Sequence, residues 1–306
     1  MVAAAVVVTA SLLVDRLVGD PHSRYHPVAL LGRFIGWWGV PGRFPAGFER
    51  AYGAIGALLT VALFVLPFLL VQVAAPWYLY ILLAPFLLKV CLAWRSLEEH
   101  TLAVVQALGD GGIDAARDRV GMVVSRDTAH LEREHVLSAA YESMTENLVD
   151  SIISPLFYFG LFGLAGAAAF RATNTMDAML GYRDERIRIG WFAARADDIL
   201  NFIPARIAGA ILLVYFTLLG RGGPAWRAFR RDAKKRPGFN GGIPMAIIAG
   251  GVGVCLEKPG VYALGDAEQT LEEGGTGIIR AVRAAVIIFA AIEIAALFLL
   301  WSVSYT

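Results

Sequence analysis

The stretch ESMTENLVDSIISPLFYFGLFGLAGAAAF, residues 142–170, decides the fold class. Its first part places Glu142, Glu146 and Asp150 four residues apart, and residues 151–170 then carry no charge. Side chains four residues apart lie on nearly the same face of an α-helix. The pattern therefore predicts one helix face with three carboxylates, which leads directly into a segment apolar enough for a membrane.

The composition of the whole chain indicates an integral membrane protein. Of 306 residues, 57% are hydrophobic and only 17% are charged, whereas a soluble domain carries about 25% charged residues. Residues 51–88 contain no Asp, Glu, Lys or Arg, and about 20 apolar residues are enough for one spanning helix. We predict an all-α, multi-pass bundle in the cell membrane. It would form a single membrane domain over residues 1–306, with a polar helical region at about 95–150 inserted between membrane segments.

Several segments are predicted to reach membrane depth. The predicted spans are 2–18, 52–73, 76–94 and 283–303. Residues 151–170 and 203–220 are apolar but interrupted by glycine or proline, which favours broken or re-entrant helices that line a cavity, and we expect that neither crosses fully. Residues 237–256 predict a loop or a broken helix. Residues 221–238 hold seven Lys and Arg against one Asp, which predicts a cytoplasmic position.

Several classes of function lack support in the sequence. The net charge of +1 gives no general attraction to nucleic acid. Neither G-x-x-x-x-G-K-[ST] nor G-x-S-x-G occurs, so any ATP would be bound without a P-loop, and no covalent serine is indicated.

Two more groups of acids and amides adjoin apolar segments. RATNTMDAMLGY places Asn174 and Asp177 three residues apart, and ARADDILNFIPAR places Asp197, Asp198 and Asn201 within about one turn. One such group alone is ordinarily a solvated helix face, but ionisable residues at membrane depth mark functional cavities. Carboxylate and amide oxygens suit Mg²⁺, particularly together with phosphate, and the flanking arginines suit phosphate or a carboxylate. The three groups together predict a Mg²⁺–phosphate site in a membrane-facing pocket.

Six segments follow one another along nearly the whole chain. They are DRLVGDPHSRYHPVALLGRFI, VSRDTAHL, ESMTENLVDSIISPLFY, NTMDAMLGY, ARADDILNFIPAR and EKPGVYALGD. In this order they resemble the CobD/CbiB family of cobalamin-biosynthesis proteins, the adenosylcobinamide-phosphate synthases. Where that family usually shows Ser-Pro-Asn before a glycine, this chain has Gly238, Phe239 and Asn240, so only the asparagine is kept.

The resemblance implies an amide-forming membrane enzyme, and the distribution of Lys and Arg predicts that its active site faces the cytoplasm. The implied reaction joins (R)-1-aminopropan-2-ol O-phosphate, or aminopropanol itself, to the propionate carboxylate of adenosylcobyric acid, and yields adenosylcobinamide phosphate. The implied partners are this corrinoid, the aminopropanol phosphate and the lipid bilayer, without nucleic acid; a homo-oligomer is left open. Activation of the carboxylate through phosphoryl transfer would use Mg²⁺ and ATP, and a base would deprotonate the attacking ammonium.

The expected site residues divide by role. The expected catalytic residues are Glu146, Asp150, Asp177 and Asp198. The expected metal ligands are Glu142, Glu146, Asp177, Asp197 and Asp198. The expected contacts to substrate or phosphate are Arg126, Asn174, Arg195, Asn201, Arg206 and Asn240.

Three other functions make different demands on the sequence. A non-enzymatic membrane sensor of the AmpE type resembles a distant relative of this chain. Such a sensor would not need all of the acid and amide residues described above in the same order. A Mg²⁺-dependent membrane phosphotransferase ordinarily shows D-G-x-x-A-R, which this chain lacks. A cation transporter would place its acids within unbroken spans. The enzyme is therefore the favoured function.

Overall fold

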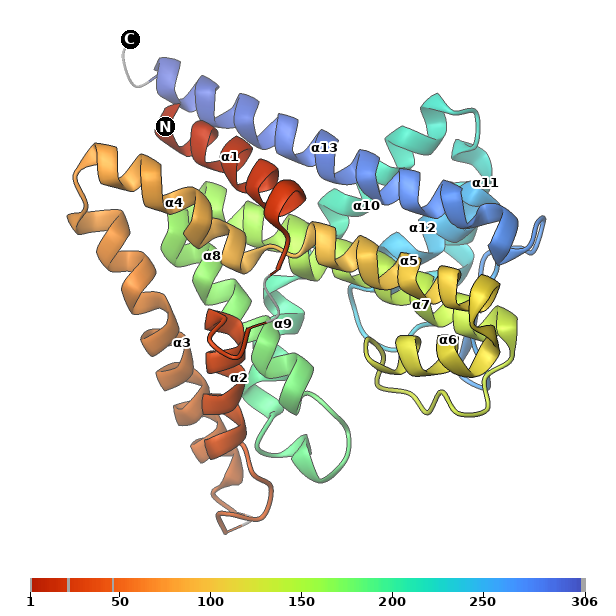
Figure 1. Ribbon diagram of the computed structural model, residues 1–306, viewed down its shortest axis with the longest axis horizontal. Coiled ribbons are helices and arrows are strands. Elements are labelled where there is room, and N and C mark those ends of the chain that lie inside the picture. Colours follow the sequence, from red (N-terminus) through yellow and green to blue (C-terminus); the bar gives the residue numbers. More distant parts are fainter. Residues whose placement is uncertain (1, 21–22, 46, 304–306) are drawn as a thin grey trace. The chain divides into compact units, whose positions relative to one another are not determined.

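The computed structural model of the protein describes residues 2–20, 23–45 and 47–303, and its elements are almost all helices (Figure 1). The chain divides into two compact units that alternate along the sequence. Unit 1 comprises Met1–Ala93, Asp150–Asn201 and Ala290–Thr306; unit 2 comprises Trp94–Val149 and Phe202–Phe289. The expected helical fold is confirmed, and the expectation of a single domain stays a prediction.

Unit 1 is organised around α8 (Ser154–Leu180), whose buried face is rich in alanine. Small side chains let neighbouring helices approach closely. Helix α8 packs against four helices that precede it in the chain and one that follows it. These neighbours are α1 (Val2–Val18), α2 (Pro27–Trp38), α3 (Glu49–Ala74), α4 (Trp77–Cys91) and α9 (Trp191–Leu200). A 3₁₀ turn at Glu185–Ile187 lies in the loop between α8 and α9.

Unit 2 contains α12 (Gly242–Val252), an apolar helix that is buried along nearly its whole length. This short helix agrees with the broken helix expected within 237–256. Helices α7, α10 and α11 and both strands pack against it. The helices of unit 2 are α5 (Trp94–Asp110), α6 (Gly112–Gly121), α7 (Arg133–Leu148), α10 (Phe202–Leu218), α11 (Gly222–Asp232) and the first part of α13 (Leu271–Val303).

A small hairpin in unit 2 is the element that the sequence pattern did not predict. Strands β1 (Leu256–Lys258) and β2 (Tyr262–Leu264) pair antiparallel, with Lys258 directly opposite Tyr262. Three residues per strand are too few to give a recognisable alternation of polar and apolar side chains. The hairpin matters because it carries both side chains toward one side of the sheet.

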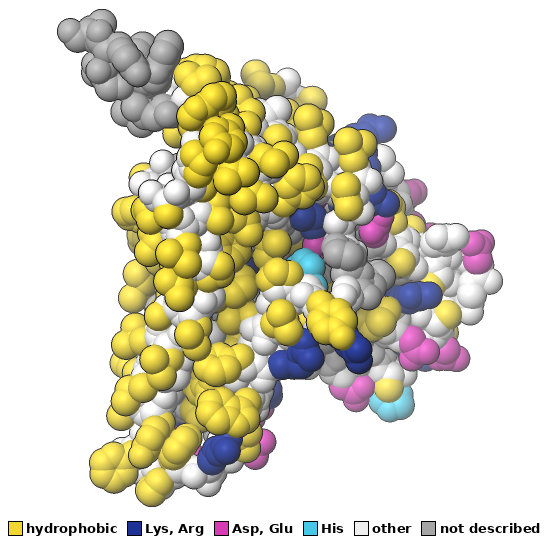
Figure 2. Space-filling model, turned by 60° about the vertical axis from the view of Figure 1, so that its left-hand side comes forward, with side chains coloured by type: hydrophobic (Ala, Val, Ile, Leu, Met, Phe, Trp, Pro, Cys, Tyr) yellow, Lys and Arg dark blue, Asp and Glu magenta, His cyan; other side chains and the backbone are white. Residues whose placement is uncertain are grey.

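Five helical stretches among the described residues are long and apolar enough to cross a membrane. They are Glu49–Ala74, Trp77–Asp110, Arg133–Leu180, Trp191–Leu218 and Leu271–Leu299. The chain is thus a multi-pass helical membrane protein, and Figure 2 shows the broad hydrophobic surface that such a protein presents. Residues 151–170 and 203–218 lie in these stretches, so length and composition do not support the expectation that neither crosses.

Helix α8 is broken at Gly163, as its glycine content predicted. Gly163 has φ +68°, in the left-handed region that favours glycine. Gln72 of α3 reaches across the break: its Nε2 donates to the carbonyl oxygen of Phe162 at 3.1 Å, and its Oε1 accepts from the amide of Ala165 at 3.0 Å. A break in a membrane helix leaves main-chain groups that need partners from a neighbouring helix. Gln72 provides both.

Candidate functional site

A π-helical turn at Val149–Ile153 interrupts the series of acids that opened the sequence. Glu142 and Glu146 lie on α7, which ends at Leu148, and both line one cavity of unit 2. Asp150 lies in the wider turn and belongs to unit 1. Asp150 does not line the cavity of Glu142 and Glu146, and its charge acts on Arg171 instead. Such π-helical turns occur frequently at functional sites.

A buried cluster in unit 1 joins the two predicted groups of acids and amides, and we call it the amide–carboxylate cluster. It comprises Ser154, Asn174, Asp177, Asp197, Asp198 and Asn201. Asp197, which is 8% exposed, accepts from Asn174 Nδ2 at 3.2 Å and from Asn201 Nδ2 at 2.9 Å. Ser154 Oγ, at the start of α8, donates to Asn201 Oδ1 at 2.6 Å. Buried carboxylates need such hydrogen bonds, so Asp197 is firmly positioned.

Asp177 and Asp198 lie at the edge of the cluster, where each keeps part of its surface exposed. Their charges act on Asp197, and Arg195 pairs with Asp198 at 3.4 Å. The Asp177 side chain lies against Gly181, since a Cβ at that position would be 2.1 Å from Asp177 Oδ1. Three carboxylates within electrostatic range favour a nearby cation.

The cluster fits Mg²⁺ better than it fits a metal held wholly by protein. Among the described residues, no group of three or more His, Cys, Asp and Glu side chains is arranged to hold a metal. Mg²⁺ usually keeps several waters and is bound through one or two carboxylates together with substrate phosphate. Asp177 and Asp198 can supply these two carboxylates. Asp197 already accepts two hydrogen bonds, and Glu142 and Glu146 lie in unit 2.

A second group of polar side chains in unit 1, which we call the Lys89 network, comprises Asp15, Asp20, His26 and Lys89. Both aspartates belong to the segment DRLVGDP. Lys89 is 5% exposed; it pairs with Asp20 and lies 3.6 Å from Asp15. His26 Nε2 lies 3.7 Å from Asp20. Burial lowers the pKa of His26, and the charges of Lys89 and Arg171 lower it further against the opposing effect of Asp20. His26 is therefore neutral at pH 7.

The Lys89 network borders a cavity of about 500 Å³ that also reaches Arg171 of α8. Arg171 Nη1 lies 3.5 Å from Ser151 Oγ in the π turn, and the charges of Asp20 and Asp150 act on the guanidinium. Asp150 therefore lies close enough to Arg171 to interact with its charge. Since Arg171 and Asn174 are three residues apart on α8, the network and the amide–carboxylate cluster share one helix face.

A cavity of about 290 Å³ in unit 2, which we call the arginine cavity, holds the acids of α7. Its polar and charged lining residues are Ser125, Arg126, Glu142, Ser143, Glu146, Asn147, Arg236, Lys258 and Tyr262. Arg126 grips Glu142 with both Nη atoms, at 2.5 and 3.4 Å. Arg236 pairs with Glu146. Each acid is therefore tied to an arginine, and Arg126, predicted to contact phosphate, does line a cavity.

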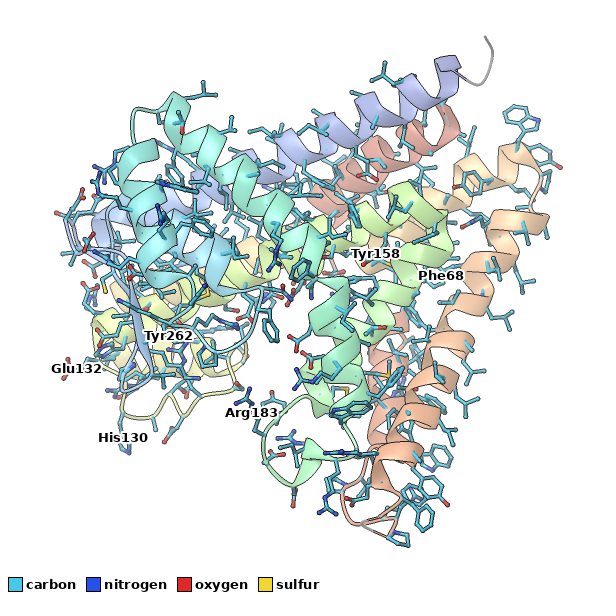
Figure 3. All side chains as sticks on the ribbon, turned by 180° about the vertical axis from the view of Figure 1, so that it is seen from behind. Phe68, His130, Glu132, Tyr158, Arg183 and Tyr262 are labelled. Carbon is cyan, nitrogen blue, oxygen red and sulfur yellow. The ribbon has the colours of Figure 1, made fainter. Side chains whose placement is uncertain are left out.

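Glu142 is the most heavily bonded acid of this cavity and is only 2% exposed. Besides Arg126, it accepts from Tyr262 Oη at 2.5 Å and from Ser138 Oγ at 2.7 Å. Figure 3 labels Tyr262 on the hairpin. Burial, together with the charge of Glu142 and the hydrogen bond to it, raises the pKa of Tyr262. The phenol stays protonated, and these three donors leave Glu142 poorly suited to bind a metal.

The other two predicted contact residues lie together in unit 2. Arg206 Nη1 donates to Asn240 Oδ1 at 3.3 Å and to the carbonyl oxygen of Phe202 at 2.6 Å, and the guanidinium lies 3.3 Å from the centroid of the Phe202 ring. Neither Arg206 nor Asn240 lines the arginine cavity. They form a separate polar pair.

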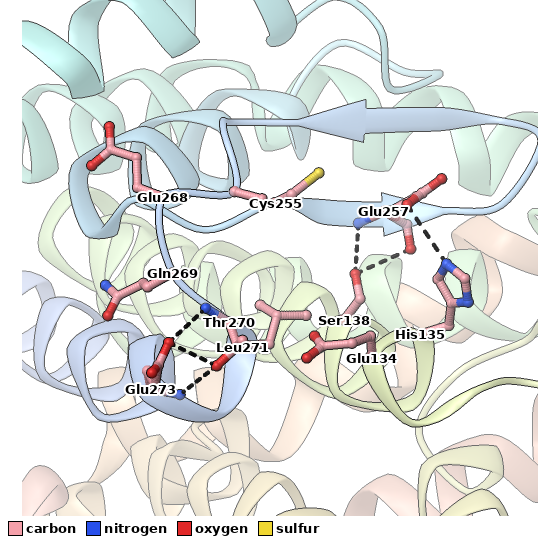
Figure 4. A pocket seen from close by; sticks show the side chains of 11 residues that line it. Glu134, His135, Ser138, Cys255, Glu257, Glu268, Gln269, Thr270, Leu271 and Glu273 are labelled. Carbon is pink, nitrogen blue, oxygen red and sulfur yellow. Dashed lines mark hydrogen bonds and ion pairs between the residues drawn. The ribbon is translucent and has the colours of Figure 1, made fainter.

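A third cavity, of about 480 Å³, lies between α7, the hairpin and the start of α13 (Figure 4). His135 Nε2 lies 3.6 Å from Glu257, and Ser138 Oγ accepts from the Glu257 amide at 2.6 Å. Its acidic lining residues are Glu134, Glu257, Glu268 and Glu273, and neither Lys nor Arg is among the described residues that line it. Ser138 joins this cavity to Glu142, so it fixes the hairpin on α7.

The sequence patterns did not identify several residues of these sites. Lys258 and Tyr262 stand in EKPGVYALGD, a segment that indicated only a family resemblance. Arg236 lies in the basic segment that indicated only orientation, and Lys89 lies at the end of an apolar run. Ser154 carries no signal beyond its place beside the acids.

The fold and these sites together define a multi-pass helical membrane protein with buried charged and amide side chains. Residues 8–289 match the model of the family described as CobD/Cbib protein. The chain therefore belongs to the CobD/CbiB family, as the six segments predicted.

Relatives from archaea and bacteria cover most of the chain. It is 43% identical over 265 residues to the probable cobalamin biosynthesis protein CobD of Methanothermobacter thermautotrophicus, which covers 85% of this chain and 86% of the relative. It is 42% identical over 262 residues to that of Thermococcus kodakarensis (85% and 84%), and 38% identical over 265 residues to the cobalamin biosynthesis protein CobD of Dehalococcoides mccartyi (84% and 85%). No solved structure matches the chain.

Proposed function

We propose that this protein acts in cobalamin biosynthesis as an adenosylcobinamide-phosphate synthase. It would join an aminopropanol unit, preferably as its O-phosphate, to the propionate of adenosylcobyric acid. Family membership and the names of the relatives support the pathway. The observation that carries the chemistry is the amide–carboxylate cluster, because a buried, hydrogen-bonded Asp197 flanked by two partly exposed acids suits a metal–phosphate reaction.

The reaction demands activation at the carboxylate and deprotonation at the amine. A carboxylate does not condense with an ammonium unaided, because its oxygen is a poor leaving group and the amine has no free electron pair. ATP, as cosubstrate, would transfer its terminal phosphoryl group to a propionate oxygen and leave as ADP. The amine nitrogen then attacks the carbonyl carbon, the C–N bond forms, the phosphate group departs with the electron pair, and a base takes the proton.

The residues of unit 1 can be matched to these demands. Asp177 and Asp198 would hold Mg²⁺, which when bound would neutralise phosphate charge. Asp197 would keep Asn174 and Asn201 in place. Asp150, beside Arg171, would be positioned to accept the proton of the amine, and Arg195 would contact phosphate or carboxylate at the rim.

The cytoplasm is the side we propose for the reaction. Arg236 of the arginine cavity belongs to residues 221–238, the most basic segment of the chain. Lys and Arg accumulate in cytoplasmic segments. Corrinoid intermediates and ATP are available on that side.

Synthesis of adenosylcobinamide phosphate by the purified protein tests this function. The assay would mix adenosylcobyric acid, aminopropanol phosphate, ATP and Mg²⁺, and would follow the product by chromatography. Asp177→Asn and Asp198→Asn should each reduce the rate at least about 100-fold. Asp118→Asn, at an exposed site on α6, is the matched control and should leave the rate unchanged. Full activity in both variants, or no product from the unaltered protein, would overturn the proposal.

A further inference from the structure

We infer that the arginine cavity of unit 2 is a binding site for the phosphate monoester of the small amine substrate. This inference deepens the proposed function and rests on it for the identity of the amine. Phosphate binding itself follows from the residues that line the cavity.

The charge of the cavity favours an anion. Arg126, Arg236 and Lys258 bring three positive charges against the two carboxylates of Glu142 and Glu146, which leaves a net charge of +1. Both arginines are paired with an acid. Lys258, in contrast, has no ion-pair partner within the described part of the chain. A lysine that lines a cavity and has no carboxylate within about 4 Å of its ammonium is available to a charged ligand.

The donors of the cavity converge because of the hairpin register. Lys258 lies directly opposite Tyr262, so both side chains leave the hairpin on the same side. Tyr262 is fixed there by its 2.5 Å hydrogen bond to Glu142. The bonds between Arg126 and Glu142 use two of the five N–H groups of the guanidinium, and the others remain for a ligand. Phosphate oxygens accept hydrogen bonds from both kinds of cation.

The size of the cavity excludes the larger substrate. Pockets for drug-sized ligands occupy roughly 300–1,000 Å³, and the arginine cavity has about 290 Å³. A corrinoid is far larger than such a ligand, whereas a phosphorylated three-carbon amino alcohol has nine non-hydrogen atoms. The amine-phosphate substrate therefore fits, and the acids Glu142 and Glu146 are positioned to hold the arginines rather than a metal.

Direct binding to the purified protein in detergent tests the inference without any turnover. Titration calorimetry would compare aminopropanol O-phosphate, inorganic phosphate and unphosphorylated aminopropanol. The two phosphates should bind and the free amino alcohol should not. Lys258→Met should weaken phosphate binding at least about tenfold, the effect of one charge-assisted hydrogen bond. Lys234→Met removes an exposed lysine of the same unit and should have no effect.

Three outcomes separate the sources of phosphate and the two proposals. Competition by short-chain phosphatidic acid but not by aminopropanol phosphate would identify a lipid headgroup site and overturn the inference. Unchanged phosphate affinity in Lys258→Met, in protein that forms the cobinamide product, would also overturn it and leave the synthase standing. Phosphate binding that depends on Lys258, in protein that forms no product, would support the anion site and overturn the synthase.

Discussion

Replacing Gln72 with leucine should destabilise unit 1 by about 1–3 kcal/mol. Gln72 makes two hydrogen bonds across the break in α8, to the carbonyl of Phe162 and from the amide of Ala165. Hydrogen bonds between membrane helices contribute about 0.6 kcal/mol on average and up to about 1.7. Two such bonds give the range, and leucine keeps most of the side-chain volume while removing both.

Thermal unfolding in detergent and hydrogen exchange measure this change at two levels. The unfolding midpoint of Gln72→Leu should fall, and the amide of Ala165 should exchange faster than the amides of the last two turns of α8. Gln106→Leu, at an exposed position on α5, serves as the control and should stay within about 0.5 kcal/mol. If Gln72→Leu unfolds at the same temperature as the control and the amide of Ala165 keeps its protection from exchange, the two hydrogen bonds of Gln72 do not stabilise the broken part of α8.

Three further predictions follow from single side chains. Both carboxylate oxygens of Glu293 are buried without a hydrogen-bond partner among the described residues, so Glu293→Leu should raise the unfolding free energy by about 1–3 kcal/mol in chemical denaturation; a loss of stability would contradict this. Gly181→Ala would bring a Cβ to 2.1 Å from Asp177 Oδ1 and should lower synthase activity at least about tenfold, unlike Gly47→Ala at an open position, and equal rates would refute the packing argument. Burial lowers the folded-state pKa of His26, so the neutral histidine contributes stability above about pH 6.5, and this contribution is lost as the pH falls toward the folded-state pKa. The unfolding midpoint of His26→Asn should therefore depend less on pH, between about 5 and 7, than the midpoint of the unaltered protein. Parallel curves for the two proteins would refute this prediction.

The membrane fold could be predicted from the sequence because its cause is local. Uncharged runs of sufficient length predict spans, and the glycines of residues 151–170 predicted the break that lies at Gly163. The contacts among Asn174, Asp197 and Asn201 also agree with the spacing, since two short helical segments each present their polar residues on one face. Local patterns of polar residues therefore indicated these three members of the amide–carboxylate cluster, but they did not indicate Ser154.

Longer-range features could not be predicted in the same way. The arginine cavity combines Arg126, Glu142, Arg236 and Lys258, which are separated by up to 132 positions in the sequence, and no periodic pattern links them. The π turn at Val149–Ile153 also could not be predicted, because no residue type in this segment indicates a π turn. Both depend on packing between distant segments, which spacing alone does not encode.

The alternation of the two units along the chain sets an order for biogenesis. The hydrogen bonds among Ser154, Asn174, Asp197 and Asn201 all lie within residues 150–201, so they can form as soon as the ribosome has released that segment. The arginine cavity must wait for Tyr262, about 60 residues later. While the chain inserts into the membrane, Glu142 therefore lacks the hydrogen bond from Tyr262 until the hairpin has been made, and Arg126 is its cationic partner. Nascent chains stalled before the hairpin would contain a complete amide–carboxylate cluster and an incomplete arginine cavity.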